Sequence, residues 1–147
     1  EKHMGTRSLT IVYDEQAKPL VTLYRQMDGY PTGHGMELRD FLSPFDVVQG
    51  IPWGSVPAEG RKRANGPECL AAQLVAHFKT ECGGFYIMPY EKDFGSHGEE
   101  YRYEVFPGVP EQPIRLRVIG GWNTVLFDGP VQHFDPAEIE AQEAKND

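Results

Sequence analysis

Alternating apolar and polar positions predict two strands at the start of the chain. In the segment SLTIVYDE, Leu9, Ile11 and Tyr13 share one phase, which is the period of two expected of a strand. After the break at QAKP, the segment LVTLYRQM resumes the alternation, with Arg25 in the same phase as Leu23. The short connection between the two runs predicts an antiparallel hairpin.

Helical spacing of apolar residues follows in two places. Residues 38–45 fit a short helix that Pro44 ends, because proline disfavours helical geometry in the preceding residue. A longer helix is predicted over 67–82, with Pro67 in the first turn and an apolar stripe of Leu70, Ala71, Leu74, Val75 and Phe78. Residues 48–66 contain too many glycines and prolines for regular structure, and so long a loop is usually functional.

Four further strands are predicted in GFYIMPY, EYRYEVFP, PIRLRVIGG and TVLFDG. The order of these elements lacks the βαβ rhythm and predicts an α+β fold, an antiparallel sheet of about five to seven strands with two helices packed on it. Arg102, Glu104, Arg115 and Arg117 share one phase and indicate a solvated ladder of charges. We expect one α+β domain over 4–135, an acidic frayed tail over 136–147, and an appended remnant at 1–3 before a natural start at Met4.

The amino-acid composition limits the kinds of molecule that the protein is expected to bind. The formal charge of −8 argues against duplex nucleic acid, whose phosphates require a basic face. No apolar run is long enough to cross a membrane and no signal-peptide pattern is present, so we expect a cytoplasmic protein without a membrane partner. Cys69 and Cys82 are expected to be buried free thiols, and no metal or cofactor motif occurs.

The segment DGYPTGHG, between the second strand and the first helix, has two interpretations. Its glycines serve a strand–helix connection with positive φ angles, or they leave the backbone bare so that an anion can reach N–H groups at the helix start. Thr32 is a candidate N-cap. The candidate ligand contacts in this segment are Asp28, Gly29, Tyr30, Gly33, His34 and Gly35.

Nearby cations extend the candidate site. Arg7 and Arg25 lie on apolar phases close to the glycine turn, where they form an anion pocket or pair with Asp28, Glu37 or Asp40. In the long loop, Arg61 and Arg63 belong to the densest basic run and Trp53 can stack on a planar base, although a solvated basic run is the commoner case.

The opening MGTRSLTIVYDE followed by YRQMDGYPTGHGMELRDFL resembles a family of small uncharacterised proteins, many encoded by phages. They begin Met-Gly-Thr-Arg and contain an Asp-Gly-Tyr-Pro turn followed by Gly-x-Gly. The resemblance covers about the first third of the chain, at Gly5, Thr6, Arg7, Asp28, Gly29, Tyr30, Pro31, Gly33 and Gly35. It implies a phage or bacterial accessory protein in the host cytoplasm. By analogy with phage proteins that sequester nucleotide signals, it suggests a role against host defence.

These patterns favour a non-enzymatic protein that binds a small anionic, nucleotide-like ligand. Two alternatives stay open. One is an enzyme acting on the same class of ligand, with His34 as general acid or base and Asp28 orienting it. The other is a protein–protein inhibitor or interaction module that uses aromatic surface residues, and self-association is compatible with each.

Overall fold

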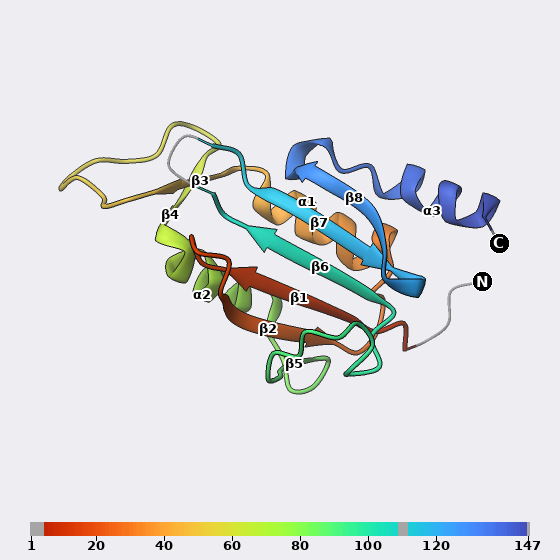
Figure 1. Ribbon diagram of the computed structural model, residues 1–147. Helices are drawn as coiled ribbons and strands as arrows, with labels where there is room; N and C mark the ends of the chain where they lie inside the picture. Colours follow the sequence, from red (N-terminus) through yellow and green to blue (C-terminus); the bar gives the residue numbers. More distant parts are fainter. Residues whose placement is uncertain (1–4, 109–111, 147) are drawn as a thin grey trace.

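The strands of the protein form one large sheet and one small one (Figure 1). The computed structural model describes residues 5–108 and 112–146, so the expected remnant at 1–3, the start at Met4 and residue 147 lie outside the described residues. The strands are β1 (Ser8–Tyr13), β2 (Pro19–Arg25), β3 (Phe45–Val48), β4 (Lys62–Asn65), β5 (Phe85–Ile87), β6 (Tyr101–Phe106), β7 (Arg115–Gly120) and β8 (Thr124–Pro130). The helices are η1 (a π-helical turn, Pro31–Gly35), α1 (Met36–Leu42), α2 (Gly66–Phe78) and α3 (Pro136–Lys145), with 3-10 turns η2 (Gly121–Asn123) and η3 (Val131–His133).

The large sheet has six strands in the order β5-β2-β1-β6-β7-β8. Neighbouring strands are antiparallel except β1 and β6, which run parallel in the middle of the sheet. This arrangement confirms the predicted α+β fold, the number of strands and the β1–β2 hairpin. The parallel central pair was not predicted, because its two strands are far apart in the sequence.

Helices α1 and α2 cover the inner face of the large sheet and bury the main core. The predicted stripe of α2 faces the sheet, with Leu70 and Leu74 fully buried. The helix ends at Phe78, before the predicted end at Cys82, because Lys79 is already extended. Cys82 is exposed and Cys69 is half-buried, so the expectation of two buried thiols is wrong for Cys82.

The outer face of the sheet is partly covered by residues 88–100. Arg102 of β6 is buried there and forms an ion pair with Glu99, at 2.7 Å between Nε and Oε2. The same guanidinium donates hydrogen bonds to the backbone oxygens of Glu91, Lys92 and Asp93. The solvated charge ladder predicted for this face is therefore wrong at Arg102 and also at Glu104, which is 5% exposed and accepts from Arg117.

The small sheet pairs β3 with β4 in parallel. The segment that joins them, residues 49–61, is called the arm, and Figure 1 shows it projecting from the body of the molecule. Irregular structure was predicted for all of 48–66, but residues 62–65 form β4. The sequence pattern does not indicate this strand, because only Ala64 among its residues is buried. Strand β4 is defined by its pairing with β3 and not by apolar alternation.

The acidic end of the chain forms helix α3, over Pro136–Lys145. Asp135 caps the helix by accepting a hydrogen bond from the backbone N–H of Glu138 at 3.2 Å. Ile139 packs against the core, and Glu140 accepts a hydrogen bond from the backbone of Thr32 at 2.6 Å. No helix within residues 5–108 and 112–146 is long and apolar enough to cross a membrane.

Candidate functional site

Arg25 and His34 meet on the inner face of the sheet, where β2 ends. The alternation of β2 points Arg25 to the same side as Leu23. The η1 turn directs the His34 ring into the core, where it is 0% exposed and its centre lies 5.0 Å from the Phe78 ring and 5.2 Å from the Tyr103 ring. Two of the residues predicted from sequence are therefore in direct contact.

The hydrogen bonds of His34 fix its tautomer. Arg25 Nη1 lies 3.2 Å from Nδ1 of the ring, and Thr10 Oγ1 lies 2.6 Å from Nε2. A guanidinium can only donate, so Nδ1 must be the acceptor and must carry no proton. In the neutral ring the proton is then on Nε2, which donates to the hydroxyl of Thr10. His34 therefore serves as an acceptor that orients Arg25.

The surroundings of His34 keep it neutral. Burial, and secondarily the charge of Arg25, lower the pKa of His34 from its ordinary 6.5 to about 3. The Asp28 carboxylate accepts from the Tyr30 hydroxyl at 3.3 Å, while it is the backbone oxygen of Asp28 that accepts from the His34 N–H at 2.8 Å. Among the described contacts, the Asp28 carboxylate does not reach the His34 ring, which leaves the suggested acid–base pair without its geometry.

Arg25 is held by further contacts and faces a cavity. Its Nε donates to the backbone oxygen of Met27 at 2.7 Å, its Nη1 pairs with the Glu37 carboxylate, and its guanidinium carbon lies 5.0 Å from the centre of the Phe85 ring. The adjoining space, which we call the Arg25 cavity, has a volume of about 530 Å³. It is lined by Arg25, Glu37, Asp40, Phe41, Lys62, His77, Phe78, Thr80 and Phe85.

Strand β4 divides the basic run between two cavities. Because successive side chains of a strand point to opposite sides, Lys62 lines the Arg25 cavity whereas Arg61 and Arg63 line a different one. The Nζ of Lys62 lies 5.8 Å from the Phe41 ring centre and 5.9 Å from the Phe45 ring centre. The sequence analysis therefore nominated this basic run, but not its member that lines the cavity beside Arg25.

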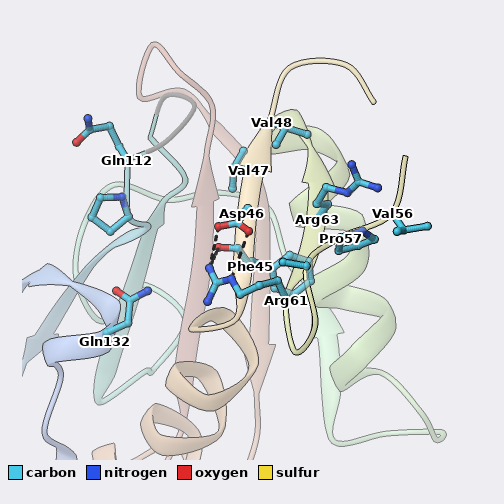
Figure 2. A pocket seen from close by; sticks show the side chains of 12 residues that line it. Phe45, Asp46, Val47, Val48, Val56, Pro57, Arg61, Arg63, Gln112 and Gln132 are labelled. Atoms are coloured by element: carbon cyan, nitrogen blue, oxygen red, sulfur yellow. Dashed lines mark hydrogen bonds and ion pairs between the residues drawn. The ribbon is translucent and has the colours of Figure 1, made fainter. Parts of the chain in front are cut away.

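Figure 2 shows the second space, the Arg61 cavity, between β3, the arm and the glutamines 112 and 132. Its volume is about 520 Å³. Arg61 forms a two-point ion pair with Asp46 at 2.8 and 3.3 Å, which lowers the pKa of that carboxyl. Arg63 donates to the hydroxyl and backbone oxygens of Ser55 at 2.9 and 3.0 Å. Both guanidinium groups are thus engaged by the protein's own chain.

The glycine turn is packed against its own chain. A Cβ atom on Gly33 would overlap the backbone oxygen of Asp28, and one on Gly35 would lie 3.1 Å from the rings of Phe134 and Tyr103. Neither glycine has a positive φ, so their role is close approach. The N–H groups of residues 33–35 bond to backbone oxygens within the segment, and that of residue 32 bonds to the Glu140 carboxylate. The anion at this turn is therefore a side chain of α3.

The other predicted residues lie apart from the Arg25 cavity. Arg7 contacts the loop at Gly98, and its buried Nε has no hydrogen-bond partner among residues 5–108 and 112–146. Gly29 packs against Ser8, and a Cβ atom there would lie 2.8 Å from that side chain. Trp53 is fully exposed on the arm and lines neither cavity.

Sequence reasoning missed Lys62, His77, Phe41 and Phe85 as cavity residues. Phe41, His77 and Phe85 lie in or beside predicted apolar stripes, where the pattern alone cannot distinguish a cavity residue from ordinary packing, and Lys62 lies in a segment predicted to be irregular. Within the described part of the chain, no group of three or more His, Cys, Asp or Glu side chains is arranged to hold a metal ion. No protein-family model, curated protein or solved structure matches the chain.

Proposed function

We propose that the protein binds a small anionic, nucleotide-like ligand in the Arg25 cavity and does not transform it. The observation that carries this proposal is the guanidinium of Arg25, which is oriented by His34, Met27 and Glu37 at the wall of a cavity of ligand size. A guanidinium suits phosphate and carboxylate groups because it stays charged and its N–H groups donate charge-assisted hydrogen bonds.

Preorganisation supports this role for Arg25. The side chain is 14% exposed, and its Nε and Nη1 are fixed by the three acceptors. Among the described residues, its Nη2 has no hydrogen-bond partner. A group that is already held in one conformation loses little conformational entropy when a ligand arrives. Arg25 can therefore give its remaining hydrogen bonds to an anion at low cost.

The charges around the cavity leave one cation unpaired. Glu37 is engaged by Arg25, and Asp40 pairs with Arg39 at 3.1 Å. Lys62 has no ion-pair partner among the described residues and faces the same space. An anionic ligand would thus meet Arg25 and Lys62 without a competing free carboxylate between them.

Aromatic side chains in the cavity wall support a planar group on the ligand. The His77 ring stacks on Phe41, with centres 4.3 Å apart and planes inclined by 21°. His77 is exposed and Phe85 is half-buried, so both present surface toward the cavity. Bases stack on such rings with gains of about 1–3 kcal/mol each.

The neutral, buried state of His34 favours binding over acid–base catalysis. The resemblance to phage-encoded proteins extends the proposal to the sequestration of a host defence signal in the cytoplasm. Incubation of the wild-type protein with each candidate nucleotide, followed by mass spectrometry, distinguishes the two activities. We expect the nucleotides to stay intact, and product formation would replace the binding proposal by an enzymatic one.

Lys62 and Arg63 provide a matched pair for the binding test. They are neighbours in β4 with the same charge but face different cavities. We expect Lys62→Gln to weaken nucleotide binding about tenfold through the lost charge, and Arg63→Gln to leave it unchanged. The measurement is calorimetric titration of a panel of mono-, di- and cyclic nucleotides, guided by mass spectrometry of any ligand released from the denatured protein. Equal affinities of the two variants would contradict the assignment to the Arg25 cavity.

A further inference from the structure

Exposed apolar side chains gather in three places on the described surface. One is the arm, with Ile51, Trp53 and Val56; another is the region of β5, with Tyr86, Ile87 and Tyr90; the third is the β7–β8 connection, with Trp122 and Val125. Single exposed apolar residues are common in proteins, but clusters of large ones mark interaction surfaces. The first two clusters lie in segments of opposite net charge.

The arm presents Trp53 on an ordered turn. The backbone N–H of Ser55 donates to the oxygen of Pro52 at 3.1 Å, and the Ser55 hydroxyl donates to the same oxygen at 2.8 Å. Arg63 at the base of the arm binds the hydroxyl and backbone oxygens of Ser55 and so fastens the turn to β4. Trp53 is fully exposed and Val56 is 82% exposed. The turn thus holds a large aromatic side chain out in solvent.

A shallow groove near β5 has an apolar surface that can contact the Trp53 side chain. This groove, called the Tyr86 groove, has a volume of about 450 Å³ and is lined by Tyr24, Gln26, Tyr86, Met88 and His97. The rings of Tyr24 and Tyr86 lie 6.2 Å apart across neighbouring strands and form its floor on the outer face of the sheet. Aromatic rings and a methionine favour contact with an indole ring. The side-chain amide oxygen of Gln26 can accept a hydrogen bond from the indole N–H.

Opposite charges surround the arm and the groove. Residues 49–63 contain Arg61, Lys62 and Arg63 against Glu59, and the ion pair of Arg61 with Asp46 leaves a net charge of +1. Among residues 88–100, which border the groove, the exposed charges are Glu91, Asp93 and Glu100 against Lys92, a net charge of −2, because Glu99 is buried in its ion pair with Arg102. Figure 1 shows the arm extending away from the sheet edge at β5, so its natural counterpart is the groove of a second molecule.

We propose that the arm of one molecule docks on a second copy of the chain, with Trp53 in the Tyr86 groove. The contact joins two different surfaces, so two copies either exchange it reciprocally in a closed dimer or form larger rings or chains, unless one surface is blocked. It is independent of the proposed ligand, because the groove shares no residue with the Arg25 cavity.

Two variants that each lack one surface test the contact. Trp53→Ser removes the inserted side chain, and Tyr86→Ser removes the floor of the groove. We expect the wild-type protein to self-associate with rising concentration in sedimentation velocity and light scattering, and each variant alone to associate about 30-fold more weakly, as for a central aromatic contact. An equimolar mixture of the two variants should form a complex of twice the 16.6 kDa chain mass and no larger species. Each folded variant is checked first by circular dichroism.

A third variant and a salt series complete the test. Trp122→Ser removes the other fully exposed tryptophan and should leave association unchanged. Added salt should weaken the wild-type association, because the surrounding charges are exposed and screened. A wild-type protein that stays monomeric at all concentrations, a mixture that does not associate, or a loss confined to Trp122→Ser would each overturn the proposal.

Discussion

His34 contributes to the protein through what its ring accepts. A histidine between two glycines near acidic residues suggests acid–base chemistry, yet this side chain is sealed in the core with both nitrogens bonded. Its lone pair on Nδ1 places the guanidinium of Arg25, which no aliphatic side chain could do. In the proposed function, Arg25 therefore contacts the anion, and His34 acts only by positioning Arg25.

The first prediction concerns pH. The pKa of His34 is about 3 in the folded protein and 6.5 when the chain is unfolded, so the unfolded chain binds the extra proton between these values. Stability is therefore full above pH 6.5 and falls as pH decreases below it, by about 2 kcal/mol between pH 7.5 and 5. Urea unfolding across this range measures the change.

A glutamine at position 34 is the control for this prediction. Its amide can accept from Arg25 and donate to Thr10, but it does not titrate. His34→Gln should therefore remove most of the decline between pH 7.5 and 5, and the decline that remains belongs to other groups. Parallel stability curves for the two proteins would show that His34 is not the titrating group.

The second prediction concerns the glycine turn. In Gly33→Ala the new methyl group would overlap the Asp28 backbone oxygen and would lie 2.9 Å from the Tyr30 ring. We expect a loss of about 1–3 kcal/mol in the free energy of unfolding, as for other overpacked sites. Gly121→Ala is a suitable control, because a Cβ atom there meets nothing within 4 Å. A loss of similar size in both variants would show that the contact at Gly33 is not its cause, because Gly→Ala without a clash lowers the entropy of the unfolded chain and stabilises the protein.

At the level of elements, helix α3 closes the start of η1. The Glu140 carboxylate accepts the N–H of Thr32 in the position that a bound anion would take at a helix N-terminus. Tyr101 of β6 donates to Glu143 of the same helix at 3.0 Å, so α3 is joined to the sheet as well. The last helix thus stabilises a turn that lies over a hundred residues earlier in the chain.

The third prediction removes the charge of this contact. Glu140→Gln should destabilise the protein by about 1 kcal/mol, because a neutral acceptor forms a weaker hydrogen bond than a carboxylate. It should also speed amide hydrogen exchange at Thr32. Glu138→Gln lies on the same helix in an exposed position and should leave the amide exchange of Thr32 unchanged. Equal exchange rates at Thr32 in the two variants would refute the role of Glu140.

The sequence pattern predicted those helices and strands that are defined by residues close together in the sequence. The strands of the large sheet and helix α2 follow from periods of two and 3.6 in their apolar residues, which neighbouring positions alone define. Strand β4 and the docking of α3 could not be predicted, since β4 depends on β3 as a partner and Glu140 depends on Thr32. The same holds for the candidate site: Arg25 and His34 were predicted, but only the folded chain brings Lys62 and His77 beside them.

At the scale of the whole molecule, the negative charge is unevenly distributed. The chain carries a formal charge of −8 in total, although residues 49–63 carry a formal +2. The cations of this segment are spread over two cavities and the arm, so one short basic run serves several surfaces. A charge count along the sequence cannot show which cavity each cation lines. That depends on the alternation of side chains in β4, a strand that the sequence pattern did not predict.

The parallel pairing of β1 with β6 has a consequence for synthesis on the ribosome. Ser8 pairs with Tyr101, so the middle of the sheet cannot close until most of the chain has been made. At about 5–20 residues per second, the first hairpin waits on the order of 5–20 s for its central partner. During that interval Leu23 and Val12 have no core to enter, and the nascent hairpin presents an open strand edge. The period of greatest vulnerability to aggregation therefore precedes the release of the chain.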